Sequence, residues 1–378
     1  MTDPRQSPSV QSDDNGLVVK LLDEDEFSSC GEAWNRLLDA STSESFFLKW
    51  EWLYTFWETI ERENASLLVC FCYDGIRLVG IAPLYVYSSK LMGFSVRKIA
   101  FLGDRVASDY LDIFAQPGYE RCCCDAVVNI LRESDAAKFT LFEFDGVCAD
   151  SNIYSYLVAA DGAGRVVLPR FECPRAMLSA GFDEYLKKLS SSTRYYLGRK
   201  QRKLEKNFPD LEVRHTDFSG SAGLLDVLFD LHERRWRTLV NRSSTFCSAF
   251  RKEFNSRLLE RTGEGDGFFS SVWIDGKPAS IMYSFLYRGN AYFYQNGWDP
   301  QYAPYSIGIY NIQEAIRYAV GKGCRTFDFL RGPEYYKYMY CDDIRQAYAV
   351  LLFSCRLSGR CLEGLVRLRQ VQKKILNR

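Results

Sequence analysis

The sequence predicts an α/β protein, a mixed sheet with helices on both faces, built from two similar halves. The chain has 378 residues, which is long enough for two domains of ordinary size. Helical and strand-like patterns alternate along both halves. Each half also contains a strand–turn–strand pattern with Asp-Gly in the turn, at Asp74-Gly75 and at Asp275-Gly276. Together these observations favour a degenerate internal duplication.

In the first half, residues 1–16 are polar and predict a disordered tail. The aromatic run from Phe46 to Trp57 has apolar residues at helical spacing, which is typical of a core. The other expected elements are a strand at Leu17–Leu22, a helix at Cys30–Ala40, a hairpin of Ser66–Tyr73 with Leu78–Val86, strands at Lys98–Leu102 and Thr140–Phe144, and a helix at Cys123–Arg132.

The second half begins with a basic segment that predicts one helix over Phe182–Lys206. Beyond it, the patterns predict strands at Leu211–His215, Gly267–Ile274, Ala279–Tyr287, Ala291–Gly297, Arg325–Leu330 and Ala347–Cys355, and helices at Leu224–Val240, Ala249–Thr262 and Ser306–Gly321. The expected domains are therefore 17–174 and 175–358, followed by a basic amphipathic helix over 359–378. That last helix either packs on its own domain or contacts an anionic membrane surface.

The formal net charge is zero, but the charges are unevenly divided. Residues 1–174 carry 15 Lys and Arg against 27 Asp and Glu, whereas residues 175–378 carry 33 against 21. Either the two halves attract each other, or the second half binds an anion such as a phosphate-bearing cofactor. The start of the sequence has no apolar signal segment, so we expect a cytoplasmic protein, or one peripheral at the inner membrane.

Cysteine and histidine usage gives no support for a metal site. The 13 Cys form no CxxC pair and only two His are present, so we expect no metal and no disulfide framework. No motif for sequence-specific nucleic-acid binding occurs either.

Two segments of the second half stand out as candidate sites. In the first, a strand ends near Gly297, a loop with Gln301 and Tyr305 follows, and a helix opens with Ser306 and Gly308. A helix N-terminus of this kind is suited to bind a phosphate, although Ser306 as an ordinary N-cap is the simpler reading.

The second segment is Thr326–Lys337. Asp328 lies on a strand otherwise built for a buried sheet, so its charge needs a partner such as Arg331 or Lys337. A structural ion pair and a catalytic cluster are both consistent with this pattern.

The order of the motifs resembles a known family. The pattern Leu-His-x-x-Arg-Trp, a hairpin, Ser-x-Gly opening a helix and Phe-Asp-Phe-Leu-Arg-Gly-x-Glu-x-Tyr-Lys is similar to the Fem-like branch of the GNAT acyltransferases. More narrowly, it resembles members associated with cellulose and exopolysaccharide biosynthesis. In the first half, Phe-Phe-x-x-x-Glu-Trp, Ile-Ala-Pro-Leu-Tyr and Phe-Leu-Gly-Asp followed by Ser-Asp-Tyr-Leu-Asp agree, so the resemblance covers roughly residues 17–357.

The resemblance implies two tandem GNAT-like domains, the first degenerate, with the acyl donor bound to the second. The donor would lie between the strands at 291–297 and 325–330, with its pyrophosphate near Gln301, Tyr305, Ser306 and Gly308. The chain departs from the usual (Gln/Arg)-x-x-Gly-x-(Gly/Ala) signature, because Gln301 is followed at +3 by Pro304. The donor alternatives are therefore acyl-CoA, an acyl carrier protein or an aminoacyl-tRNA.

The expected reaction is direct attack of an amine on a thioester. The amine, with a pKa near ~10, needs a base, for which His232 and Glu334 are candidates. The oxyanion needs a donor, for which Lys337, Arg331 or a backbone amide is suited, with Asp328 and Arg331 positioning Lys337. The acceptor would be an amino sugar, a lipid amine or an amino acid, and a non-catalytic binding module is the alternative from another class.

Overall fold

The computed structural model describes residues 10–12, 16–91, 94–106, 108–133, 141–159, 164–178, 181–353 and 359–367. The chain forms two compact units, one of Met1–Phe171 with Gln346–Arg378 and one of Glu172–Arg345. The sequence had predicted that the second domain runs to residue 358. Residues after Arg345 belong instead to the first unit, because Ala347–Phe353 pair with Leu141–Cys148. Among the described residues, no helix is long and apolar enough to cross a bilayer.

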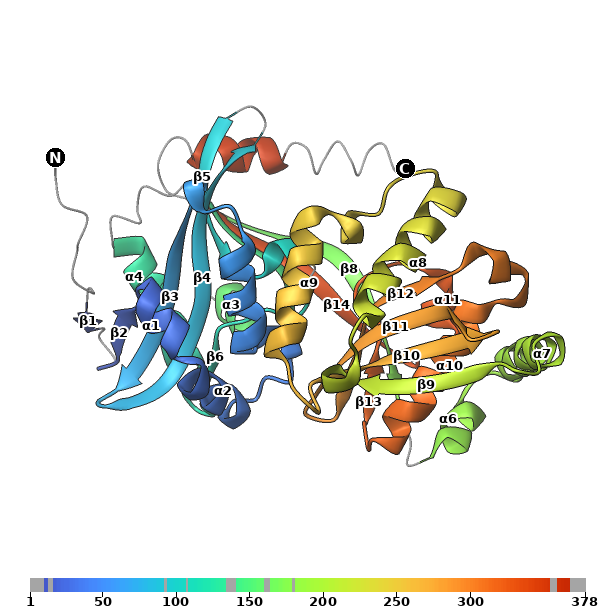
Figure 1. Ribbon diagram of the computed structural model, residues 1–378. Coiled ribbons are helices and arrows are strands. Elements are labelled where there is room, and N and C mark those ends of the chain that lie inside the picture. The colour runs from blue at the N-terminus through green and yellow to red at the C-terminus, as the bar shows by residue number, and fades with distance from the viewer. Residues whose placement is uncertain are drawn as a thin grey trace. The chain divides into compact units, whose positions relative to one another are not determined.

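The first unit is built on one mixed sheet (Figure 1). Its strands follow the order β1-β2-β3-β4-β5-β7-β14, with β6 beside β4. The elements are β1 (Val10–Ser12), β2 (Val18–Leu21), α1 (Glu24–Ser29), α2 (Gly31–Ala40), α3 (Trp50–Thr59), β3 (Ala65–Asp74), β4 (Arg77–Leu91), β5 (Phe94–Phe101), β6 (Phe114–Ala115), α4 (Glu120–Glu133), β7 (Leu141–Cys148), α5 (Asn152–Ala159), β14 (Asp343–Phe353) and a helix over residues 359–367.

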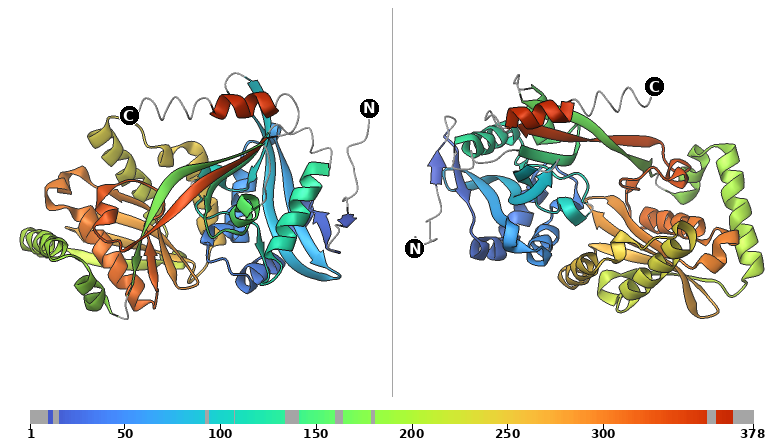
Figure 2. Two further views of the ribbon diagram at one scale, coloured as in Figure 1. Left: turned by 180° about the vertical axis from the view of Figure 1, so that it is seen from behind. Right: turned by 90° about the horizontal axis from the view of Figure 1, so that it is seen from above.

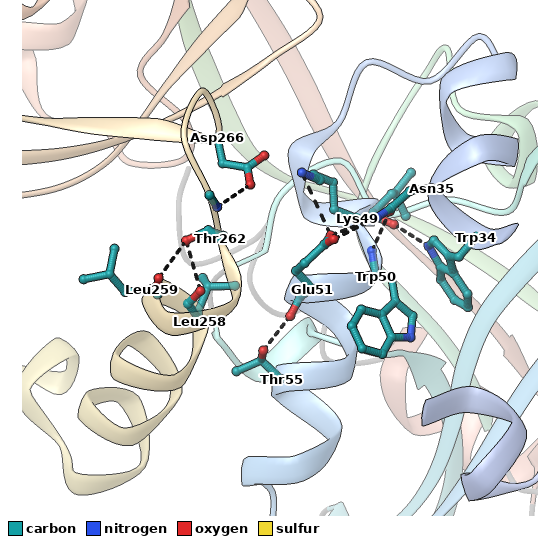
Figure 3. Close-up of polar contacts among 12 residues, drawn as sticks. Trp34, Asn35, Lys49, Trp50, Glu51, Thr55, Leu258, Leu259, Thr262 and Asp266 are labelled. Carbon is teal, nitrogen blue, oxygen red and sulfur yellow. Dashed lines mark hydrogen bonds and ion pairs between the residues drawn. The ribbon is translucent and has the colours of Figure 1, made fainter. Parts of the chain in front are cut away.

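The aromatic run at Phe46–Trp57 forms core, as predicted. Phe46, Phe47, Trp52 and Phe56 have no exposed surface. The Asn35 side chain holds the first turn of α3 in place (Figure 3). Its amide oxygen accepts from the Trp50 N–H (3.1 Å), and its amide nitrogen donates to the Glu51 carboxylate (2.8 Å).

The strands of the second unit are covered by helices on both faces (Figure 2). The strand order is β8-β13-β12-β11-β10-β9. The elements are β8 (Arg165–Met177, which begins in the first unit), α6 (Phe182–Lys188), α7 (Ser191–Asn207), β9 (Glu212–Asp217), α8 (Leu224–Val240), α9 (Ala249–Arg261), β10 (Gly267–Ile274), β11 (Lys277–Tyr287), β12 (Asn290–Trp298), α10 (Ile307–Gly321), β13 (Thr326–Asp328) and α11 (Tyr335–Tyr338).

Neighbouring side chains of β11 face opposite layers of this unit. Met282 belongs to the same buried cluster as Ile312 and Ile316 of α10. Tyr283 instead contacts Phe218 and Tyr294 on the other side of the sheet. This alternation is expected for a strand that is covered on both faces.

The two units repeat one order of elements, which confirms the predicted α/β fold with two similar halves. In the first unit, β3, β4 and β5 are antiparallel neighbours and β5 pairs with β7 in parallel. In the second, β10, β11 and β12 are antiparallel neighbours and β12 pairs with β13 in parallel. The Asp-Gly turns occupy the same position in both, between β3 and β4 and between β10 and β11.

Three expected elements differ from the structure. Within the expected disordered tail, Val10–Ser12 pair with Val18–Lys20, while residues 1–9 and 13–15 lie outside the described residues. The single helix expected over 182–206 is two helices, because Leu189 is extended and the Ser190 hydroxyl caps α7 by accepting from the Thr193 N–H (3.1 Å). The strand expected at Arg325–Leu330 ends at Asp328, because Leu330 has a left-handed backbone with φ 54°.

The described part of the C-terminal segment is a helix that packs on its own unit. Leu362 is buried in a cluster with Leu141, Val166 and Phe353, and Val366 lies against the same cluster. Arg367 donates to the carbonyl of Arg165 (2.9 Å). These contacts agree with the packing alternative, while residues 368–378 of the expected helix lie outside the described residues.

Candidate functional site

Two parallel strands of the second unit separate along their length. β12 and β13 pair only at Asn290–Tyr292 with Thr326–Asp328. Just beyond, Tyr283 pairs with Gln295 and Ser284 with Phe293, so Tyr294 is an extra residue in β12. A bulge turns a strand and interrupts its ladder. Past Tyr292, β12 no longer pairs with β13.

A pocket of about 200 Å³ opens where β12 ends and α10 begins. Strand β12, helix α8, the loop into α10, the first turns of α10, and α11 all contribute to its wall. The lining residues are Arg235, Asn296, Trp298, Ala303, Ser306, Ile307, Gly308, Ile309, Ile312 and Tyr336.

The first turn of α10 has an uncommon geometry. Ser306 has a left-handed backbone with φ 59°, and its side chain makes no capping hydrogen bond to the described backbone of the helix. Ser306 is therefore the N-cap of α10 by position, but without the side-chain hydrogen bond of an ordinary N-cap. The opening amides of a helix carry partial positive charge. The Ile309 N–H already donates to the Ser306 carbonyl (3.0 Å), so the candidate donors to the pocket are the amides of Ile307 and Gly308.

Gly308 allows the Trp298 side chain to lie against that turn. A Cβ at this position would lie 2.9 Å from Trp298 Cδ1 and 3.1 Å from Nε1. Any other residue would push the indole, which itself lines the pocket. The close approach requires glycine here.

Arg235 contributes a positive charge to the same pocket. Its Nη1 donates to Asn296 Oδ1 (3.0 Å), and its guanidinium lies over the Trp298 ring, 5.3 Å from the centroid. Among the described residues, no carboxylate lies within ion-pair distance of it. Burial lowers the pKa of Arg235, but a guanidinium remains charged. A partly buried cation that forms no ion pair with a described carboxylate, beside a helix N-terminus, is suited to bind an anion.

His232 lies one turn before Arg235 on α8 and is 5 % exposed. Its Nδ1 is 2.9 Å from Ser244 Oγ, and the Gln295 side chain also hydrogen-bonds the imidazole. Burial and the nearby Arg235 charge lower the pKa of His232 to about 4. The ring is thus neutral near pH 7, and both neighbours fix its orientation.

The loop between β13 and α11 is held by the predicted charged residues. Asp328 Oδ1 accepts from the Leu330 N–H (2.8 Å). The Lys337 Nζ donates to the Arg331 carbonyl (2.7 Å) and lies 3.0 Å from Glu334 Oε2. Lys337 is 4 % exposed, its ammonium is bonded within its own loop, and it does not belong to the residues that line the pocket.

The four residues expected to bind the donor divide into two pairs. Ser306 and Gly308 line the pocket. Gln301 is exposed, and its N–H donates to Asp299 Oδ1 (3.0 Å). Tyr305 packs edge-on against Phe208 of the loop after α7. The structure therefore brings Ser306 and Gly308 to the pocket, but not Gln301 or Tyr305.

Sequence reasoning missed Arg235, Asn296, Trp298 and Tyr336 as pocket residues. Arg235 was visible as the arginine of the Leu-His-x-x-Arg-Trp pattern, one turn after His232. Tyr336 directly precedes Lys337 in the second candidate segment. Its pKa is raised by burial, so its hydroxyl keeps its proton.

Residues 191–338 match the family model described as an acetyltransferase (GNAT) domain. The matched residues lie within the second unit, which is therefore similar in this range to a GNAT-type domain. No curated protein sequence matches the chain significantly.

Solved structures share the fold over most of the chain. One is FemX, with 10% identity and a TM-score of 0.61 over 89% of this chain and 98% of that one. Another is a conserved protein of unknown function from Bacteroides thetaiotaomicron, with 12% identity and a TM-score of 0.57 over 86% and 97%. A third is the C-terminal domain of a putative lysylphosphatidylglycerol synthetase from Agrobacterium fabrum, with 11% identity and a TM-score of 0.51 over 83% and 95%.

Proposed function

We propose that the second unit is an N-acyltransferase that moves an acyl group from a phosphopantetheine thioester to an amine. The observation that carries this proposal is the pocket between the end of β12 and the start of α10, with Arg235 and the first turn of α10 in its wall. A phosphate is the anion that suits both a guanidinium and a helix N-terminus. The GNAT match over residues 191–338 supports the same chemistry.

The reaction proceeds by direct attack. The nitrogen lone pair of the neutral amine forms a bond to the thioester carbonyl carbon, and the carbonyl oxygen takes up the negative charge. Collapse of that oxyanion breaks the carbon–sulfur bond and releases a thiolate. The ammonium proton passes to a base, and the thiolate finally takes a proton from solvent.

Backbone amides of β12 past the Tyr294 bulge are our choice for the oxyanion site. They lie on the edge of β12 that does not pair with β13. Lys337 is less suited to this role, because its ammonium already bonds the Arg331 carbonyl and pairs with Glu334. We assign Lys337 and Asp328 to positioning the loop that carries Tyr336.

Tyr336 and Glu334 are the side chains we place beside the leaving group and the amine. Tyr336 lines the pocket and stays protonated, so its hydroxyl can donate a hydrogen bond to the thiolate. The Glu334 carboxylate acts electrostatically on both Tyr336 and Arg235, and its side chain is 49% exposed, so it is reachable as a base. His232, with a pKa of about 4, is a weak base and is better suited to fixing Gln295.

The test compares two ligands that differ only in a phosphate, 4′-phosphopantetheine and pantetheine. Arg235→Met removes the charge and keeps much of the stem. Hydrogen bonds to charged groups contribute about 1.5–3 kcal/mol, so calorimetry should show phosphopantetheine binding about 10–150 times more weakly. Pantetheine binding should change little.

Arg237→Met is the matched control, because Arg237 lies on the same helix, is 70% exposed and pairs with Glu233. It should leave both affinities unchanged. Equal loss for pantetheine and phosphopantetheine in Arg235→Met would contradict the phosphate assignment. Release of thiol from an acyl-CoA with a panel of amino sugars, lipid amines and amino acids then tests transfer itself. The association with polysaccharide synthesis stays a prediction.

A further inference from the structure

Helix α7 carries an excess of positive charge that its own unit does not neutralise. Its 17 residues include six Lys and Arg and one acid, Glu205. Cations on other helices pair with acids one turn away, as Lys187 does with Glu184, Arg257 with Glu253 and Arg317 with Glu314. For Arg199, Arg202 and Lys206, no ion-pair partner occurs among the described residues.

These three cations form a single exposed stripe. Tyr195, Arg199, Arg202 and Lys206 follow each other at spacings of four, three and four residues, which places them on one face of a helix. At a rise of about 1.5 Å per residue the stripe is roughly 16 Å long. Tyr195 heads it and is 66% exposed. Figure 2 shows α7 along the outside of the second unit.

The opposite face of α7 is buried and fixes the helix in place. Leu197 belongs to one core cluster and Leu204 to another. Because these buried leucines hold the helix in one orientation, the stripe of cations stays on the exposed face of α7. It offers charge and one aromatic ring to whatever binds there.

The basic face also reaches the rim of the candidate pocket. Lys203 Nζ donates to the Pro304 carbonyl (3.2 Å) and lies 5.1 Å from the centroid of the Tyr305 ring. These two residues lie between Ala303 and Ser306, both of which line the pocket. A ligand bound along α7 therefore passes close to residues that adjoin the pocket.

We propose that α7 docks an acidic acyl carrier protein, whose phosphopantetheine arm delivers the thioester into the pocket. This inference rests on the proposed function. A straight row of cations at helical spacing matches an acidic helix that presents carboxylates at the same spacing. The exposed Tyr195 supplies an apolar contact of the kind that anchors protein interfaces.

Two other polyanions fit the stripe less well. A membrane surface is bound by a helix that inserts apolar side chains, and those of α7 are buried in its own unit. Single-stranded RNA is bound in a groove with several aromatic side chains, whereas α7 presents a convex face with one exposed tyrosine.

The test measures binding of the full-length protein to a fatty-acid-synthase-type acyl carrier protein loaded with a hexadecanoyl group. Arg199→Gln, Arg202→Gln and Lys206→Gln are combined in one variant. The control variant combines Lys187→Gln, Arg257→Gln and Lys277→Gln, which removes the same charge elsewhere in the second unit. By anisotropy at low salt, the α7 variant should bind about ten times more weakly, and the control within about twofold of the parent protein.

Three further measurements distinguish a damaged pocket, a different anionic partner and a failure of the carrier proposal alone. The α7 variant should keep its thermal midpoint and its affinity for free phosphopantetheine, which shows that the pocket is intact. An α7 variant that loses binding to transfer RNA or to anionic vesicles, but not to the carrier, would overturn the carrier assignment. Thiol release from a short N-acetylcysteamine thioester, together with no carrier binding, would leave the proposed function standing and refute this inference alone.

Discussion

Gly308→Ala is the smallest change that should disturb the candidate pocket without unfolding the protein. The added Cβ would lie 2.9 Å from Trp298 Cδ1, against about 3.5–4.0 Å for a comfortable carbon–carbon contact. The indole must therefore move by roughly 0.5–1 Å. Such overpacking costs about 1–3 kcal/mol, while alanine gains about 1 kcal/mol of helix propensity over glycine. The free energy of unfolding should fall by only about 0–2 kcal/mol.

Binding should respond more strongly than stability. The Arg235 guanidinium packs over the Trp298 ring, so a movement of the indole displaces the charge that we assign to phosphate recognition. We expect phosphopantetheine to bind about ten times more weakly by calorimetry, which corresponds to ~1.4 kcal/mol. Gly321→Ala is the control, because it lies at the other end of α10 and its Cβ would meet no atom within 4 Å. Unchanged affinity in Gly308→Ala would refute the role of this turn.

Three further outcomes follow from the same contacts. His232 has a native pKa of about 4, below its ordinary value of 6.5, so the unfolded chain binds more protons between these values and stability is lost as pH falls through that window. The contribution of His232 to the change in stability from pH 7.5 to pH 5, measured by urea denaturation as the difference between the parent protein and His232→Gln, should be about 2 kcal/mol. Lys337→Met leaves the Arg331 carbonyl without its donor and should lower the free energy of unfolding by about 1–3 kcal/mol, whereas an unchanged denaturation midpoint would show that the ammonium does not hold the loop. Gly297→Ala places a Cβ 2.8 Å from the His232 backbone nitrogen and 2.9 Å from the Leu228 carbonyl oxygen. The variant should lower the free energy of unfolding by about 3 kcal/mol in calorimetric melting. A wild-type melting curve would contradict the close approach of α8 to β12.

Elements with a strong local pattern could be predicted from the sequence. The predicted bounds of α8 and β10 agree with the structure, because a continuous apolar stripe marks one and a buried β-rich run ending at Asp-Gly marks the other. Ser306 and Gly308 were also found, because a serine and a glycine at the opening of a helix are a local signal.

The missed features depend on contacts between distant segments. Strand β8 contains prolines and charged residues, which argue against a strand, yet Arg175–Met177 pair with β13. The break between α6 and α7 is an exception, because its signal is local: Ser190 opens the cluster Ser190–Thr193 of poor helix formers and caps α7. Arg235 lies next to Arg234 in the sequence, and only tertiary structure shows that Arg234 pairs with Asp230 while Arg235 faces a pocket.

The return of β14 to the first unit makes the second unit an insertion with its two ends together. Arg175 near one end bonds Asp343 near the other (2.8 Å), and the Met177 N–H donates to Asp342 (2.7 Å). In the first unit, the Gln346 side chain donates to the carbonyl of Phe171 (3.0 Å). The two residues at which the chain leaves and re-enters the first unit are therefore also adjacent. When the two ends of a domain lie close together, the domain can be inserted into another chain or circularly permuted without disturbing its fold. Both boundaries fall inside strands, β8 and β14, so a second unit expressed by itself should keep these strands whole and run from Arg165 to Phe353.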